Sequence, residues 1–172
     1  MRADQGSPSS KGVPPASPNR LPWPPMIYIA ATLLAVAANH LWPSWPFMDH
    51  APIRAFGAML LAVGLGLDVW AMAAMSRRRA NILPHRAATA LVTTGPFAWS
   101  RNPIYLGNTI VLIGVGFAFS NPWFLAVAPL AAMAVLRLAI LREEAHLAEI
   151  FGPAWQRYRC GTARWFGRSA SR

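Results

Sequence analysis

Side chains that could bind a charged ligand are concentrated in two blocks of the sequence, each at the edge of an apolar segment. The first is Arg101-Asn-Pro-Ile-Tyr-Leu-Gly107, where a polar loop enters an apolar run, and the second is Arg142-Glu143-Glu144, where an apolar run ends. A carboxylate can hold an ammonium group or hydroxyls, a helix N-terminus can hold an anion, and an aromatic face can stabilise a cation. The spacing therefore predicts ligand chemistry held where apolar sequence meets polar sequence.

The composition indicates that the bilayer is the solvent for most of this chain. Hydrophobic residues make up 55% of the 172 and charged residues 13%, which would leave a soluble domain of this size with too little polar surface. About 20 apolar residues are needed to cross the hydrocarbon, and four stretches come near that length: residues 26–41, 55–75, 103–119 and 122–141. We therefore expect an all-α, polytopic membrane protein with about four transmembrane helices.

The placement of the basic residues predicts the topology. Sixteen Lys and Arg against six acidic residues give a net charge of +10, and the basic residues precede the first span, separate the second from the third, and follow the fourth. By the positive-inside rule, both termini and the central loop are cytoplasmic, as in a multi-pass protein of a bacterial inner membrane. The arginines flank spans instead of forming a patch with stacking aromatics, so we expect contact with membrane lipids and not with nucleic acid.

Three regions follow from this pattern. Residues 1–25, rich in proline, serine and glycine, are expected to be a disordered cytoplasmic tail, and residues 26–75 a transmembrane helical hairpin. Residues 76–172 then hold two further spans and a cytoplasmic C-terminal helix. Cys160 is the only cysteine, which rules out an intrachain disulfide or a cysteine-rich metal site, and we expect no metal.

The second span carries both a small-residue surface and an acid. Gly57, Gly64 and Gly66 should allow close contact with another helix. Asp68 is the only charge in that span; it is either a functional group or an interfacial carboxylate that pairs with Arg54 or with a neighbouring helix.

The sequence also predicts how the two polar blocks are presented. Asn102-Pro103 is typical of a helix start, with Asn102 as the N-cap, so that free backbone N–H groups would face an anion. The helix of the fourth span should continue to about Ile150 and stop at Phe151-Gly-Pro153. Glu143 and His146 would then share one face of that helix.

With these residues in view, the C-terminal half resembles the isoprenylcysteine carboxyl methyltransferase family and its bacterial relatives, which are related to the phospholipid methyltransferases. The resemblance runs from about Thr89 to Trp165. It rests on Leu91-Val-Thr-Thr-Gly95, the block from Arg101 to Gly107, Arg142-Glu-Glu144 with Leu147, Phe151-Gly152, and Tyr158. It implies an integral membrane enzyme that uses S-adenosylmethionine, with residues 76–172 as the methyltransferase core and a cytoplasmic C-terminal cofactor-binding region.

The resemblance also implies roles for individual residues. Those expected to bind the cofactor are Thr89, Ala90, Leu91, Val92, Phe97, Asn102, Pro103, Ile104, Tyr105 and Glu143. The more familiar family pattern has histidine at the position of Asn102, which can hydrogen-bond but cannot transfer a proton. A substrate-contacting arginine of the family falls near Ala139, where Arg137 could take its place. The catalytic candidates are Glu143, Glu144 and Tyr105.

The expected reaction is methyl transfer to an amphiphilic acceptor, an isoprenoid or a lipid, with O-methylation of a carboxylate placed first. A carboxylate acceptor needs no general base, whereas an amine must be neutral, and Glu144 and His146 are the candidate bases. The alternatives are N-methylation of a phospholipid amine, a non-catalytic membrane transport or assembly protein whose charged residues form ion pairs, and a reductase that uses a nicotinamide cofactor.

Overall fold

The computed structural model describes residues 23–43, 49–78, 80 and 90–167, and within them the chain is helical with no strands. The elements are α1 (Trp23–Leu41), α2 (Ala51–Arg77), the 3₁₀ turn η2 (Gly95–Ala98), α3 (Pro103–Ala118), α4 (Trp123–Val135), the π-helical turn η3 (Leu136–Ile140) and α5 (Leu141–Gly161). The all-α expectation is confirmed. Helix α1 begins three residues before the predicted span, and most of the predicted tail lies outside the described residues.

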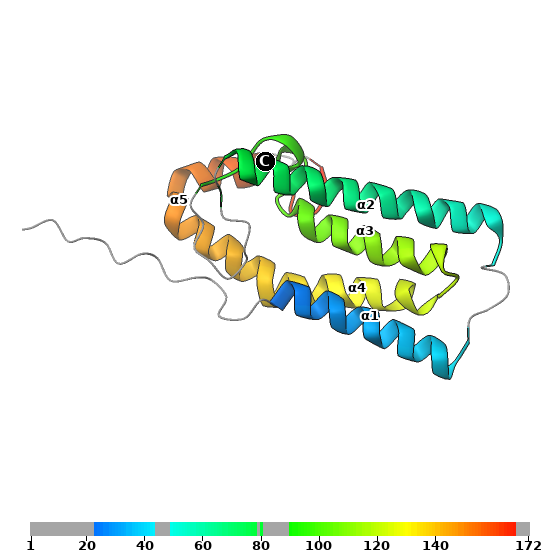
Figure 1. The fold of residues 1–172 in the computed structure, drawn as a ribbon. Coiled ribbons are helices and arrows are strands. Elements are labelled where there is room, and N and C mark those ends of the chain that lie inside the picture. Colours follow the sequence, from blue (N-terminus) through cyan, green and yellow to red (C-terminus); the bar gives the residue numbers. More distant parts are fainter. Residues whose placement is uncertain (1–22, 44–48, 79, 81–89, 168–172) are drawn as a thin grey trace, which may run out of the picture.

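The first four helices form an elongated bundle, and α5 lies at one end of it (Figure 1). Helix α2 packs along α3, α3 packs against α4, and α4 packs against α1. The end of α2, the start of α3 and all of α5 gather at the same end of the bundle, which we call the site end; the turn between α3 and α4 lies at the other. The two polar blocks of the sequence therefore meet at the site end.

The helices are long and apolar enough for an integral membrane protein. Helix α1, helix α2 and the helical run Trp123–Gly161 can each cross a bilayer by length and composition, and α3 is a shorter apolar helix of 16 residues. Large apolar side chains such as Leu33, Val63 and Leu130 are exposed along the bundle, as expected of surfaces that face lipid. Which side of the membrane the site end faces stays a prediction.

Glycines bring α2 and α3 into backbone contact. The buried residues of α2 recur every seven positions, at Gly57, Gly64 and Ala71, so they form one stripe along the helix. A Cβ at Gly64 would lie 2.8 Å from the carbonyl oxygen of Gly107, and one at Gly114 would lie 2.7 Å from the backbone nitrogen of Leu61. The predicted close contact is confirmed for Gly57 and Gly64. It is wrong for Gly66, which is exposed and would place a Cβ with nothing within 4 Å.

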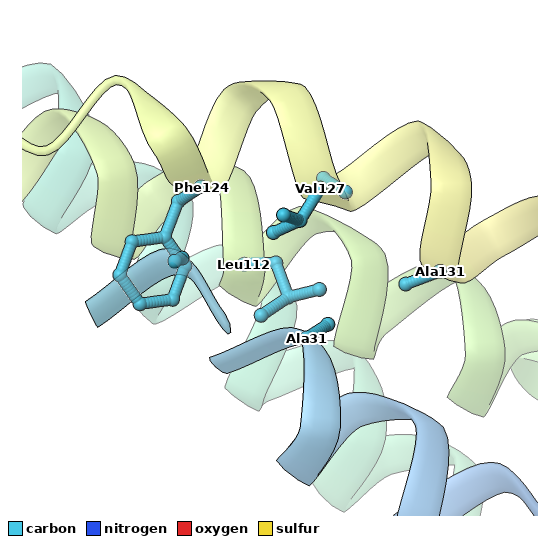
Figure 2. Packing of buried hydrophobic residues seen from close by; sticks show 7 residues of the cluster. Ala31, Leu112, Phe124, Val127 and Ala131 are labelled. Atoms are coloured by element: carbon cyan, nitrogen blue, oxygen red, sulfur yellow. The ribbon is translucent and has the colours of Figure 1, made fainter. Parts of the chain in front are cut away.

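An apolar core and a buried amide join α1 to α3 and α4. Ala31 of α1, Leu112 of α3 and Phe124, Val127 and Ala131 of α4 pack together (Figure 2). The Asn121 side chain donates to the carbonyl oxygen of Ala35 at 3.2 Å and accepts from the backbone N–H of Trp123 at 3.1 Å. Because this amide is buried, its bonds to two segments fix the turn before α4 against α1.

The last helical run is interrupted where the sequence predicted, and a second helical segment then takes a new direction. Helices α4 and η3 and the first part of α5 run from Trp123 to Phe151 without a break, so continuation beyond Leu141 is confirmed. The predicted stop at Phe151-Gly-Pro153 is confirmed as well, because Gly152 is non-helical, with φ 46° and ψ −119°, and a second helical segment follows it as far as Gly161. Glycine reaches positive φ without a steric penalty, so the kink redirects α5 and residues 162–167 return toward α3.

We expect Gly57→Ala to destabilise the bundle by about 1–3 kcal/mol, the usual effect of overpacking. The new Cβ would meet backbone atoms of Ala118 and Phe117, which cannot rotate away as a side chain can. The measurement is reversible unfolding in mixed micelles as a function of denaturing detergent. Gly66→Ala is the matched control, because its Cβ would enter open space; equal free energies of unfolding for the two variants would contradict this account.

Candidate functional site

Helix α3 begins where the sequence predicted, but the side-chain amide of Asn102 binds another segment instead of capping the helix. The helix begins at Pro103, and the Asn102 side chain makes no capping hydrogen bond. Its Nδ2 donates to the carbonyl oxygen of Arg164 at 3.2 Å. The first backbone bond of the helix runs from the N–H of Leu106 to the carbonyl oxygen of Asn102, so the N–H groups of Ile104 and Tyr105 have no acceptor within the helix.

Tyr105 and Glu143 connect the two polar blocks directly. The Tyr105 hydroxyl donates to Oε1 of Glu143 at 2.8 Å, across 38 positions of sequence. The Tyr105 ring is buried against Val135, Ala139 and Ile140, which fixes the position of its hydroxyl. The carbonyl oxygen of Tyr105 accepts from the hydroxyl of Tyr28 at 3.0 Å, so α1 also contributes to this contact.

Glu144, the neighbour of Glu143, lies between two arginines. Arg164 donates from Nε and Nη2 to its two oxygens at 3.0 and 2.8 Å, and Nη1 of Arg101 lies 3.4 Å from Oε1. The side chains of Glu144 and Arg101 are 11% and 8% exposed. Hydrogen bonding to Glu144 raises the pKa of Arg164, whereas burial lowers the pKa of Arg101 and Glu144 opposes that shift. Both oxygens of Glu144 are therefore held by guanidinium groups, and these come from two different segments of the chain.

Residues 162–167, which we call the C-terminal strap, hold the loop before α3. The backbone N–H of Arg101 donates to the carbonyl oxygen of Ala163 at 3.0 Å, and that of Gly167 donates to the carbonyl oxygen of Trp99 at 2.8 Å. Trp165 of the strap packs against the cluster around Tyr105. Arg164 was missed by the sequence reasoning, because nothing in the pattern distinguished it from the other arginines that follow the fourth span.

The remaining predicted residues are spread over the segment before α3, the start of α3, η3 and α5. Phe97 is in η2, where its carbonyl oxygen accepts from the hydroxyl of Tyr158 at 2.7 Å. Val92, Asn102 and Pro103 are buried, Ala90, Leu91 and Ile104 are partly buried, and Thr89 lies outside the described residues. Arg137 is exposed on η3. The other candidate base, His146, is buried on α5, and its Nε2 has no partner in the part of the chain that the structure describes.

Asp68 does not form the ion pair with Arg54. Arg54 instead lies 3.5 Å from Asp49 at the other end of α2, and 14 residues of helix separate it from Asp68 by about 21 Å. Oδ1 of Asp68 occupies the space that a side chain at Gly107 would fill. Within the described ranges, no group of three His, Cys, Asp or Glu side chains could hold a metal ion.

Comparison with known proteins matches the sequence of this chain to one family. The family model described as phospholipid methyltransferase matches residues 53–154, which run from α2 into α5 and include both Tyr105 and Glu143. The nickel-cobalt-cadmium resistance protein NccN of Alcaligenes xylosoxydans xylosoxydans is 35% identical over 144 residues, which are 83% of this chain. The chain spans 62% of the length of that relative. No solved structure matches the chain.

We expect Arg164→Gln to loosen the C-terminal strap without unfolding the bundle. The substitution removes the two charge-assisted bonds to Glu144, each of the kind that contributes about 1.5–3 kcal/mol. Hydrogen exchange followed by mass spectrometry should show at least about tenfold faster exchange in peptides that contain Ala163 and Gly167. The control is Arg159→Gln, which changes an exposed arginine of α5; similar exchange in both variants would show that the Glu144 contacts do not hold the strap.

Proposed function

Because this chain belongs to the phospholipid methyltransferase family, whose members are membrane methyltransferases, we propose that it transfers a methyl group from S-adenosylmethionine to an amphiphilic acceptor. The observation that carries the proposal is the hydrogen bond between Tyr105 and Glu143. It joins the two polar blocks at one end of an apolar bundle, where a water-soluble cofactor and an acceptor dissolved in lipid can meet.

The residues present suit S-adenosylmethionine chemically. Among the described residues, the hydrogen bond to Glu143 comes from a neutral hydroxyl, so no basic side chain competes with a ligand's ammonium group or ribose hydroxyls for this carboxyl group. The first-turn N–H groups of α3 suit a carboxylate. When bound, the cofactor supplies a methyl group on a sulfonium. Tyr105 orients Glu143, and the apolar side chains packed around Tyr105 exclude water.

The geometry around Glu144 favours an acceptor that needs no general base. Glu144 is held by Arg101 and Arg164, and the other candidate base, His146, is buried. A carboxylate attacks a methyl group without losing a proton, whereas an ammonium group must first lose one. We therefore place O-methylation of an isoprenoid or lipid carboxylate first. N-methylation of a phospholipid amine is the second candidate, and the family description favours it.

The catalytic candidates take different roles in this proposal. Glu143 and Tyr105 bind and orient the cofactor, whereas Glu144 positions the loop before α3 through its arginines. Arg137, exposed on η3, is the candidate contact for an anionic acceptor. Thr89, Ala90, Leu91, Val92 and Phe97 stay proposed cofactor contacts on the evidence of the family resemblance.

We expect purified protein to bind S-adenosylmethionine, and Glu143→Gln to weaken that binding at least tenfold, on the order of 1.4 kcal/mol. The substitution removes the negative charge that would hold the ligand's ammonium group or hydroxyls. Isothermal titration calorimetry in detergent measures the dissociation constant. Tyr105→Ala should have a comparable effect, because the Glu143 carboxylate then loses its hydroxyl donor.

Glu149→Gln is the matched control, since Glu149 is an exposed carboxylate on the same helix. Undiminished binding by both Glu143→Gln and Tyr105→Ala would refute the assignment of the site. Absence of binding by the wild-type protein would favour a non-catalytic transport or assembly role.

The acceptor is identified by the stability of the labelled product. After incubation of membranes containing the protein with methyl-labelled S-adenosylmethionine, we expect the label in the lipid extract, and alkali should release it as methanol. An ester hydrolyses under these conditions, whereas an N-methyl group does not. Label that withstands alkali would support the amine acceptor, and a purely water-soluble product would contradict entry from the bilayer.

A further inference from the structure

Helix α1 lies outside the family match, yet one of its side chains reaches the candidate site. The match covers residues 53–154, whereas α1 spans Trp23–Leu41. The hydroxyl of Tyr28 donates to the carbonyl oxygen of Tyr105 at 3.0 Å, across 77 positions of sequence. It also lies 3.3 Å from Oγ1 of Thr109, which itself donates to the same carbonyl oxygen at 2.8 Å. One backbone carbonyl of α3 is therefore held by two hydroxyl groups, one from its own helix and one from α1.

This carbonyl belongs to the part of α3 that is least secured by its own backbone bonds. Tyr105 is the third residue of the helix, and the first N–H groups of a helix have no acceptor within it. Helix ends therefore open more readily than helix interiors. The bond from Tyr28 ties this first turn to a second helix, and it limits the backbone motion that would move the ring of Tyr105.

Tyr28 also contacts the other side of the Tyr105–Glu143 hydrogen bond. It packs against the buried cluster that Tyr105 forms with residues of α4 and η3, and α1 contacts η3 as well as α3. Ile140 is the last residue of η3, and Glu143 follows it by three positions. Tyr28 therefore bridges the two segments that carry this hydrogen bond: it holds α3 through its hydroxyl, and the turn that leads to Glu143 through apolar packing.

We propose that Tyr28 is a positioning residue for the methyl transfer, because it fixes Tyr105, which in turn orients Glu143 toward the cofactor. The inference rests on the function proposed above, and it adds to that function a contribution from the helix that precedes the family match. Tyr28 acts through a bond to the backbone, so it needs no contact with cofactor or acceptor. Loss of its hydroxyl should alter the Tyr105–Glu143 contact, and cofactor binding as a consequence.

The contact can be followed without a ligand, because the chain has only 3 tyrosines, Tyr28, Tyr105 and Tyr158. In protein labelled with ¹³Cζ-tyrosine, the resonances are assigned by replacing each tyrosine with phenylalanine. Tyr28→Phe keeps the ring and removes the hydroxyl. We expect it to shift the Tyr105 resonance, since Cζ responds to the hydrogen bond of the phenol. The resonance of Tyr158, whose hydroxyl donates to Phe97, should stay in place.

Calorimetry separates a positioning role from a general effect on the bundle. Tyr28→Phe should weaken binding of S-adenosylmethionine about three- to tenfold, the effect of losing one neutral hydrogen bond. In a Glu143→Gln background, the same change should weaken it less than about twofold, because substitutions that act through one contact are not additive. Equal weakening in both backgrounds would overturn the inference, since a merely structural role does not depend on Glu143.

Thr32→Val is the matched control, because it also removes a hydroxyl from α1. The Thr32 hydroxyl is exposed and donates to the carbonyl oxygen of Tyr28 within the same helix, so its loss should leave the Tyr105 resonance and cofactor binding unchanged. Thr109→Val removes the second hydroxyl at the Tyr105 carbonyl. It should shift the Tyr105 resonance as well, which keeps the inference testable if Tyr28→Phe does not fold.

Failure of this inference differs from failure of the proposed function. Equal binding of S-adenosylmethionine by the wild-type protein and Tyr28→Phe, with the Tyr105 resonance unmoved, would overturn the role of Tyr28 and leave the proposed function intact. Absence of cofactor binding by the wild-type protein would count against the proposed function. The Tyr105 resonance of the ligand-free protein would then decide whether Tyr28 positions Tyr105.

Discussion

The carboxylate of Glu144 lies between Arg101 and Arg164, and this ion-paired group joins three segments that are far apart in the sequence. One arginine belongs to the loop before α3, the other to the C-terminal strap, and the carboxylate to α5. Partly buried charges of this kind require well-placed partners, so the ion pairs hold the three segments in one relative arrangement. That arrangement brings Glu143, the residue before Glu144 in α5, to Tyr105.

The packing of the helix bundle fixes the position of this ion-paired group at the site end. Glycines let α2 and α3 approach to backbone contact, and the buried Asn121 fixes the α3–α4 turn to α1. Because α2 is packed tightly against α3 and the α3–α4 turn is bonded to α1, the opposite ends of these helices, at the site end, keep fixed relative positions. The methyl transfer that we propose needs a fixed site of this kind, because its reacting groups must meet within about 3–3.5 Å.

The sequence predicted what depends on local periodicity and on backbone chemistry. The apolar spans, the start of α3 at Pro103 and the contacts of Gly57 and Gly64 were of this kind, and they were confirmed. The family resemblance was confirmed by the match over residues 53–154. What could not be predicted from the sequence depends on tertiary packing: the choice of Arg164 over its neighbouring arginines as the partner of Glu144, and the direction that the chain takes after the helix stop at Gly152. The site assignments stay predictions, because no ligand contact tests them.

The π-helical turn η3, between α4 and α5, determines in which direction around the helix axis the side chains of α5 point. The N–H of Leu141 bonds to the carbonyl oxygen of Leu136, five residues back, so this turn holds one residue more than an α-helical turn would. Each residue of an α-helix turns the chain by about 100°. A related chain that lacks a single residue between Leu136 and Ile140 would therefore direct its counterpart of Glu143 away from the counterpart of Tyr105. Insertions and deletions in this short segment should thus separate relatives that share the site from relatives that share only the bundle.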